Sequence, residues 1–199
     1  MQIIAIAGSP GTGKTSVAMA LKNIIGASVI SLKDFIDSHE LIDAWDEENE
    51  TRIVDEDRLR DALVKEIDVI TQSDTISWLI IDGLLADVIA DKCNYAVVLR
   101  LHPTMLQERL VARCYSENKI AENVQAEVLG TSTYHMQETR KNDFFDIDTT
   151  GKSIDEVALL VRDLVEGQVD ADAYRPGKVD WISNPDIDLV RVFQKKEDE

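Results

Sequence analysis

Short apolar runs alternate along the chain with segments whose apolar residues recur every three or four positions. The apolar runs cover residues 2–7, 27–31, 77–81 and 95–99, and a weaker one covers residues 144–147. Runs of this length without polar alternation are typical of strands that are covered on both faces, as in parallel sheets. The helical spacing is found at residues 15–24, 55–70, 103–114 and 153–164. Strands and helices in alternation predict an open α/β fold with a mostly parallel sheet.

The starts of the expected helices carry residues that suit a helix terminus. Asp55 is a candidate N-cap, Pro103 fits a first turn, and Ser153 with Glu156 matches a capping box. Beyond Gly167 the pattern fades, and we expect a C-terminal tail there.

Composition and charge narrow the class of protein. The chain has 199 residues, 44% of them hydrophobic, which is enough for one core. Its net charge of −17 opposes long-range attraction to nucleic acid and to anionic membranes, and it favours a basic partner. We therefore expect no membrane association and no direct binding of nucleic acid. Two cysteines without metal spacing, and an N-terminus without the basic start of a signal peptide, favour a cytoplasmic location.

Residues 8–15 read G-S-P-G-T-G-K-T and fit the phosphate-loop pattern G-x-x-x-x-G-K-[ST] at every fixed position. Glycines let the backbone curl around a polyphosphate with its N–H groups turned inward, and the following helix adds its positive end. The loop follows an expected buried strand and opens an expected helix, which is the context this motif requires. The pattern therefore predicts binding of a nucleoside triphosphate.

The chemistry of such a loop assigns roles to individual side chains. Lys14 can reach the β- and γ-phosphates, the Thr15 hydroxyl can ligate Mg²⁺, and Ser16 is placed to meet the α-phosphate. Asp82 ends the run 77–81 and is the natural acidic partner for Mg²⁺, either directly or through water. The alternative is an ordinary turn aspartate before Gly83.

Two other nucleotide-binding classes are disfavoured. The glycine spacing of the loop does not fit the dinucleotide fingerprint G-x-G-x-x-G. A GTPase would show D-x-x-G and then N-K-x-D, but Asn118-Lys119-Ile120-Ala121 lacks the final aspartate. The D-x-x-G at residues 148–151 comes after it, in the wrong order.

Arginines near the end of the run 95–99 are candidates for contact with the transferring phosphate. Arg100, Arg109 and Arg113 follow that run, and Arg109 and Arg113 are four residues apart, so they share a helix face. Arg140 is a further candidate. For Arg109, pairing with a surface acid is an equal alternative.

Residues 113–123 read R-C-Y-S-E-N-K-I-A-E-N, which resembles the lid R-G-Y-[SN]-E-x-K-x-x-[ED]-N of the archaeal-type adenylate kinases, relatives of the eukaryotic adenylate kinase isoenzyme 6. Ile53 to Asp57 look like the family's [IV]-[LV]-D-E-D, and Asp43 to Glu48 like its D-x-[YW]-D-E-E. The stretch from Tyr174 to Trp181 is similar to an ending seen in archaeal members. The resemblance covers about residues 1–181.

The resemblance implies a fold and a set of site residues. The fold would be the three-layer phosphate-loop NTPase fold with a five-stranded parallel sheet, in a kinase domain of residues 1–166 followed by a tail of residues 167–199. Residues 31–54 would form the monophosphate-binding region and residues 112–122 the lid. The residues expected to bind ATP are Gly11, Gly13, Lys14, Thr15, Ser16 and Arg113, with Mg²⁺ on Thr15 and Asp82. The catalytic residues would be Lys14, Asp82 and Arg113.

The implied activity is that of a broad-specificity adenylate kinase that transfers the γ-phosphoryl group of ATP to AMP or a related monophosphate. The family is also linked to maturation of the small ribosomal subunit, through a small-subunit ribosomal protein with a basic tail. The acidic stretch 34–61 could receive such a tail, and a solvated acidic face is the equal alternative. Contact with the immature small subunit is also implied.

One departure from the family pattern concerns hydrolysis. The family has D-x-H after the third strand, with the histidine tied to ATPase activity, whereas this chain has Leu84 in that position. A weak ATPase activity is therefore in question. Three functions stay open: a nucleoside monophosphate kinase, a ribosome-assembly ATPase, and a nucleotide-gated binding module with little turnover.

Overall fold

The computed structural model of the chain describes residues 1–47, 50–73 and 75–194. Its centre is a five-stranded parallel sheet in the order β2-β5-β1-β6-β7. The strands are β1 (Gln2–Ala7), β2 (Ser28–Ser31), β5 (Trp78–Asp82), β6 (Tyr95–Arg100) and β7 (Phe145–Asp148). Each coincides with an expected apolar run to within one or two residues. The predicted parallel α/β fold is confirmed.

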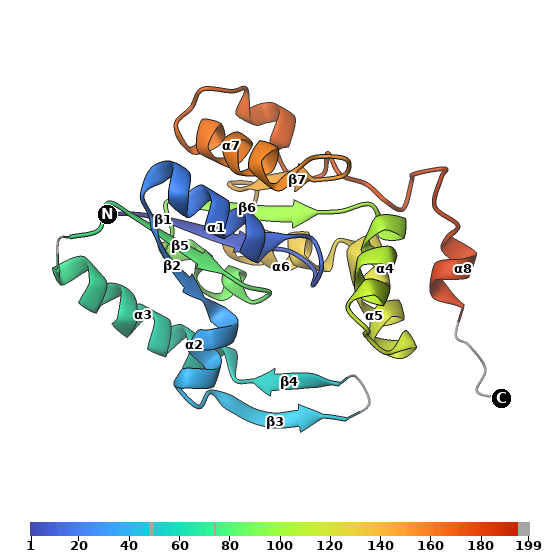
Figure 1. Cartoon of the computed structure of the whole chain (residues 1–199), viewed down its shortest axis with the longest axis horizontal. Coiled ribbons are helices and arrows are strands. Elements are labelled where there is room, and N and C mark those ends of the chain that lie inside the picture. The colour runs from blue at the N-terminus through green and yellow to red at the C-terminus, as the bar shows by residue number, and fades with distance from the viewer. Residues whose placement is uncertain (48–49, 74, 195–199) are drawn as a thin grey trace.

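Helices cover both faces of this sheet (Figure 1). On one face lie α1 (Lys14–Ile25) and α7 (Ile154–Val165), packed on Ile4 and Ile6 of β1. On the other lie α3 (Glu56–Gln72), the 3₁₀ helix η1 (Ala86–Lys92) and part of α6 (Thr131–Arg140), packed on Ile3 and Ala5. Successive residues of β1 therefore enter two different cores, which is why the run lacks polar alternation.

The helix termini form as their sequences predict. The Asp55 carboxylate accepts a hydrogen bond from the Arg58 N–H at the start of α3. At the start of α7, Ser153 and Glu156 form the complete capping box. These local contacts fix where each helix begins, and so the direction in which it crosses the sheet.

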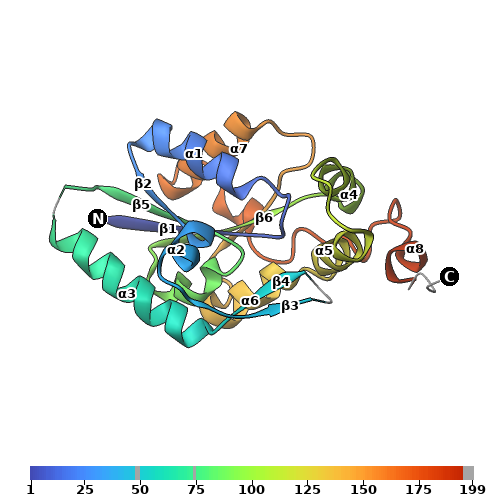
Figure 2. The same ribbon diagram turned by 60° about the horizontal axis from the view of Figure 1, so that its bottom comes forward.

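A hairpin projects from the sheet between α2 and α3 (Figures 1 and 2). It consists of β3 (Ile42–Asp46) and β4 (Thr51–Val54), preceded by α2 (Leu32–Ser38). The sequence pattern did not predict this hairpin. Glu48 of the family motif lies outside the described residues.

The third region beside the sheet is helical. It consists of α4 (Pro103–Ala112) and α5 (Glu117–Leu129), with α6 directly after α5. The pattern predicts α4, which ends two residues earlier than expected, but it did not predict α5 or α6. Apolar residues of α4 and α5 share a small cluster of their own, which includes Leu106, Leu110, Ile120 and Val124.

The C-terminal segment crosses the molecule and packs on it (Figure 1). After α7 it forms a 3₁₀ turn, η2 (Ala171–Tyr174), and a short helix, α8 (Leu189–Phe193). Trp181 and Ile187 are buried against Val128 of α5, and the Gln125 side chain donates to the Val192 carbonyl. In the part of the chain that the structure describes, no helix is long and apolar enough to cross a membrane.

Candidate functional site: a phosphate loop at the carboxyl end of the sheet

The loop between β1 and α1 has the backbone of an anion-binding turn. Gly8, Gly11 and Gly13 all have positive φ angles, of 140°, 95° and 102°. A Cβ atom on Gly8 would lie 2.4 Å from the Leu99 carbonyl oxygen of β6, so that position has no room for a side chain. Gly13 is the N-cap of α1, so the loop leads directly to the positive end of that helix.

Lys14 is held inside this loop. Its ammonium group donates to the Ser9 carbonyl at 3.0 Å, and the Thr12 hydroxyl donates to the same oxygen at 2.9 Å. Burial lowers the pKa of Lys14 to about 8, while the nearby carboxylates of Asp82 and Glu127 act in the opposite direction. A polyphosphate in the loop would add negative charge and favour the charged ammonium form.

Asp82 lies at the end of β5, next to the start of α1. Its buried carboxylate is hydrogen-bonded to the Thr15 side chain, and burial raises its pKa while Thr15 and Lys14 oppose that rise. Among the residues that the structure describes, Oδ1 of Asp82 has no hydrogen-bond partner. An orphaned carboxylate oxygen beside a threonine hydroxyl is the hard-oxygen donor set that suits Mg²⁺. The two predicted ligands therefore fit a magnesium ion.

Two of the candidate arginines, Arg109 and Arg113, lie in α4 and at its carboxyl end, near the phosphate loop. Arg113 caps the carboxyl end of α4 and is exposed, and its charge is close enough to contribute to the lowered pKa of Lys14. The Arg109 guanidinium donates to the Gly11 carbonyl at 3.1 Å. Arg109 therefore contacts the loop backbone rather than a surface acid. Thr15 and Ser16 are exposed at the first turn of α1.

Two of the four candidate arginines have other partners, and the prediction for them is wrong. Arg100 is 2% exposed and is bound between the carboxylates of Glu127 and Asp146. Arg140 donates to the carbonyls of Ala90 and Cys93, beside the start of β6. The loop faces the other end of the sheet, so Arg140 cannot reach a phosphate there. In both cases the partners lie far away in the chain, so the local sequence does not reveal them.

Glu127 is the residue near the loop that the sequence pattern missed. It is buried in α5 and accepts a hydrogen bond from the Ser9 hydroxyl at 2.6 Å. A signal existed, because Ile120, Val124 and Val128 mark the inward face of α5, and Glu127 lies on that face. An acid on the apolar face of a helix indicates a specific partner.

The expected monophosphate region is the α2–hairpin segment, which is mostly exposed. Trp45 is 56% exposed on β3, opposite Arg52 of β4. The hairpin reaches the start of α5, where the Ser116 hydroxyl donates to the Glu50 carboxylate at 2.9 Å and Lys119 donates to the Glu50 carbonyl (Figure 2). The predicted monophosphate region and lid are thus in contact.

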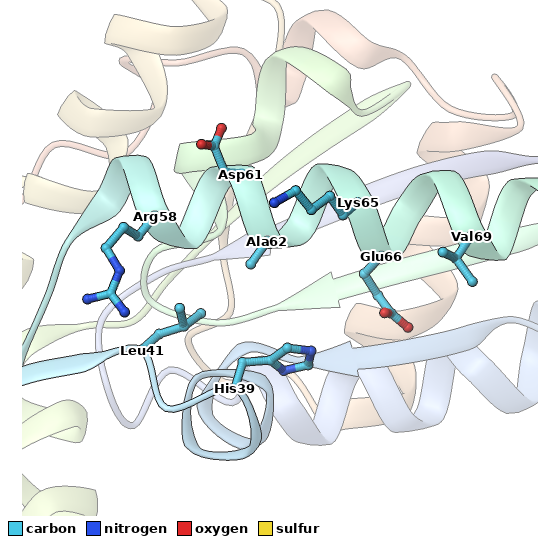
Figure 3. A pocket seen from close by; sticks show the side chains of 8 residues that line it. All are labelled: His39, Leu41, Arg58, Asp61, Ala62, Lys65, Glu66 and Val69. Carbon is cyan, nitrogen blue, oxygen red and sulfur yellow. The ribbon is translucent and has the colours of Figure 1, made fainter.

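A recess of about 520 Å³ lies beside this region but away from the phosphate loop. Side chains of α3 form one wall, and His39 and Leu41 lie opposite (Figure 3). Its charged lining residues are of both signs, with Arg58 and Lys65 beside Asp61 and Glu66. Leu84, at the position of the family histidine, is 49% exposed.

The parallel sheet and this loop define the chain as a phosphate-loop nucleotide-binding protein of the α/β class. The AAA domain family matches residues 4–130. A curated relative from Methanosarcina barkeri, named "Putative adenylate kinase", is 36% identical over 185 residues, or 90% of this chain and 97% of the relative. One of the same name from Archaeoglobus fulgidus is 33% identical over 195 residues, or 98% and 99%. The chain belongs to the archaeal-type adenylate kinase family, and it carries an AAA domain over residues 4–130.

Solved structures agree with this fold. Shikimate kinase from Acinetobacter baumannii in complex with shikimate matches with a TM-score of 0.57 at 14% identity, over 84% of this chain and 94% of that one. At this identity the likeness shows the phosphate-loop kinase fold alone.

Proposed function

We propose that the chain is a nucleoside monophosphate kinase, which transfers the γ-phosphoryl group of ATP to AMP or a related monophosphate. The observation that carries the proposal is the phosphate loop, where Lys14 points into the glycine-rich turn and Asp82 lies beside Thr15. Membership of a family whose relatives carry the name "Putative adenylate kinase" supports the choice of substrates.

On the donor side, the backbone N–H groups from Gly11 to Ser16 bind the phosphates of ATP, and Lys14 binds the β- and γ-phosphates. Thr15 and Asp82 would hold Mg²⁺, which would neutralise part of the phosphate charge. Arg113, at the carboxyl end of α4, approaches the transferred group from the lid. These groups act by alignment and charge stabilisation, which carry most of the barrier reduction in phosphoryl transfer.

The transfer itself requires no general base. An oxygen of the monophosphate, already an anion, forms a bond to the γ-phosphorus while the bond from that phosphorus to the β–γ bridging oxygen breaks. The electron pair of the broken bond stays on the departing ADP, and the acceptor becomes a diphosphate. Lys14 and Arg113 neutralise the negative charge of the transferred group. Contact between hairpin and lid, as at Glu50, would exclude water as a competing acceptor.

Hydrolysis of ATP without a monophosphate is expected to be weak. Leu84 offers no group that could accept a proton from water, and its side chain is exposed. A ribosome-assembly ATPase and a nucleotide-gated binding module are therefore the alternatives that an activity assay must separate.

A pair of steady-state assays tests the proposal, one with ATP and Mg²⁺ and the other with AMP added. We expect ADP to form only when AMP is present, at two ADP for each AMP consumed, and to be absent with Lys14→Ala. Phosphate release without AMP would favour the ATPase, and no turnover in either assay would favour the binding module. Both of these results would contradict the kinase.

A second role is supported by the acidic surface of α2, the hairpin and α3. The exposed acids of this acidic surface include Asp34, Asp37, Glu40, Asp43, Glu47, Glu50, Asp55, Glu56, Asp57 and Asp61. We propose that this surface binds the basic tail of a small-subunit ribosomal protein during maturation of the small subunit. The charge complementarity and the family resemblance support this role.

Salt-dependent binding tests this second role. A basic-tail ribosomal protein should bind the chain at low salt, and binding should weaken about tenfold between roughly 50 and 200 mM salt because exposed charges are screened. Asp57→Asn with Asp61→Asn should weaken it further, whereas Asp155→Asn on α7 should not. Binding that ignores both salt and these substitutions would contradict an electrostatic dock.

A further inference from the structure

Glu127 joins three separate parts of the chain by hydrogen bonds. Its Oε2 accepts from the Ser9 hydroxyl at 2.6 Å, and its Oε1 accepts from the Trp181 indole N–H at 3.0 Å. The same Oε1 accepts from Arg100 Nε at 2.8 Å and from the Leu101 N–H at 3.2 Å. The phosphate loop, the end of β6 and the C-terminal segment therefore share one carboxylate.

Because the Glu127 carboxylate is buried, it depends on the hydrogen-bond donors around it. Glu127 is 1% exposed, and an ionised carboxylate at such a site is costly unless each oxygen has donors. Arg100 supplies the opposite charge, and Ser9 and Trp181 supply neutral donors. Removing one donor leaves part of the cost uncompensated, so the three parts are energetically coupled.

Ser9 carries this coupling into the phosphate loop. It is 2% exposed, and its hydroxyl is used by Glu127, while its carbonyl accepts from Lys14 Nζ and from the Thr12 hydroxyl. The orientation of Ser9 therefore sets where the Lys14 ammonium rests. A change at Glu127 should move the group that binds the β- and γ-phosphates.

Trp181 carries the coupling to the C-terminal segment. Its ring is 6% exposed, packs with Val128 and Ile187, and meets the His102 ring edge-on at 5.4 Å between centroids. His102 in turn caps the start of α4 by accepting from the Thr104 N–H. The indole N–H thus reaches Glu127 only when the C-terminal segment is docked.

We propose that Glu127 is a positioning residue that makes the phosphate loop depend on the docked C-terminal segment, through Trp181 on one side and Ser9 on the other. The segment then acts as a part of the nucleotide site rather than as a tail. This inference rests on the proposed function only in that the loop must bind Mg-ATP. The experiment therefore measures the Kd for Mg-ATP and does not depend on turnover.

The variant Trp181→Phe keeps an aromatic ring in the apolar cluster and removes the indole donor. We expect it to raise the Kd for Mg-ATP about 3- to 10-fold, which is the size of the net effect of one ordinary intramolecular hydrogen bond. Trp78→Phe is the matched control, because Trp78 begins β5 and stacks on Tyr95, the first residue of β6, at the end of the sheet away from the phosphate loop. It should change the Kd less than about twofold. Thermal melts must show that both variants are folded at the assay temperature.

A double-mutant cycle measures whether Ser9 and Trp181 affect the Kd for Mg-ATP through the same carboxylate. Ser9→Ala alone should also raise the Kd about 3- to 10-fold, and combining it with Trp181→Phe should raise it little further, because both act through one carboxylate. Combining Ser9→Ala with Trp78→Phe should give the product of the single effects.

Two results would overturn the inference. One is an unchanged Kd in folded Trp181→Phe, and the other is a double variant whose effects multiply. Should the wild type bind Mg-ATP without AMP-dependent turnover, the proposed kinase would be contradicted and the affinity cycle would still decide the inference. Glu127→Gln, which keeps the shape but removes the charge, should weaken Mg-ATP at least as much as Trp181→Phe.

Discussion

The phosphate-loop side and the hairpin side of the molecule are held together in opposite ways. Around the loop, buried side chains meet buried partners, as in the contacts of Ser9 and Arg100 with Glu127. On the hairpin, the ion pairs Arg52–Asp37 and Arg58–Asp43 lie at the surface. Surface pairs contribute little to stability, whereas a buried network tolerates few arrangements.

Because of this difference, the two halves of the proposed reaction are preorganised to different degrees. The triphosphate side has its lysine and its acid in place before any ligand binds, since Lys14 rests on the Ser9 carbonyl and Asp82 on Thr15. The hairpin side offers an exposed Trp45 and surface charges instead. We therefore expect substitutions on the loop side to affect catalysis strongly, and substitutions on the hairpin to affect mainly acceptor binding.

The largest effect is expected for Lys14→Ala. Removing the ammonium group from the loop should lower kcat by about 10³-fold or more, because nothing else in the loop carries its charge. Coupled measurement of ADP formation checks this. Lys22→Ala, later on the same helix, is the control and should retain activity. Substantial turnover in Lys14→Ala would show that the phosphate loop does not take part in phosphoryl transfer.

Asp82→Asn should come next. Loss of the carboxylate removes one of the two proposed Mg²⁺ ligands, and we expect kcat/KM for Mg-ATP to fall about 10²-fold. The Mg²⁺ concentration needed for half-maximal turnover should rise as well. A variant with the wild-type Mg²⁺ dependence would show that Asp82 is only a turn residue.

For Arg113→Ala we expect kcat to fall about 10- to 100-fold while the Kd for Mg-ATP changes less than about threefold, because the role that we propose for the arginine is on the transferred group. Parallel kinetics and calorimetry separate the two. Arg162→Ala on α7 is the control. Equal losses in kcat and affinity would make Arg113 an ordinary binding residue instead.

A pH titration tests the electrostatics of the buried network around Arg100. Burial raises the pKa of Asp146 to about 6, with the Arg100 cation and the Thr133 hydroxyl opposing that rise and the Glu127 carboxylate adding to it. Because the folded state holds this proton more tightly than the unfolded state, the resulting stability is full below pH 3.8 and is lost as the pH rises through 6.

The comparison with Asp146→Asn isolates this group. The free energy of unfolding of the wild type, minus that of the variant, should fall by about 1–3 kcal/mol between about pH 4 and 7. Denaturant titrations at several pH values measure it. A difference that stays constant, or rises with pH, would contradict a protonated Asp146 beside Arg100.

The smallest effect is expected on the hairpin. Trp45→Ala should raise the KM for AMP about 3- to 10-fold, as expected for loss of stacking on a base, with little change in the KM for ATP. Ile53→Ala, also exposed but on the facing strand, is the control. An effect on ATP instead of AMP would reverse the assignment of the two sides.

The sequence predicts much of the loop side because its signals are local. Glycines, a lysine and a threonine at fixed spacing need only the flanking strand and helix, and Asp82 follows from the end of a buried run. Arg100 and Arg140 could not be placed in this way, since their partners lie 27 and about 50 residues away in the chain. The hydrogen bond between Ser9 and Glu127 could not be predicted for the same reason, because the two residues are 118 positions apart in the chain.

The hairpin and the C-terminal segment escaped prediction for a different reason. The residues of β3 and β4 are mostly exposed and mix apolar with polar side chains, so no hydrophobic alternation marks them. Among the described residues after Gly167, the buried apolar side chains are few and scattered, such as Trp181 and Ile187. They pack against Val128 of α5 and do not form the apolar face of a helix. Hydrophobic periodicity reveals the buried face of a helix or strand. A segment that is buried only at single, separated residues has no such face, so its sequence shows no periodicity.

Calorimetric titration of Mg-ATP into the wild type and into Lys14→Ala decides whether the phosphate loop binds a nucleoside triphosphate. We expect a single saturable site in the wild type, and affinity in Lys14→Ala that is at least about tenfold weaker. Absence of any heat of binding in the wild type, or equal binding by both proteins, would contradict it.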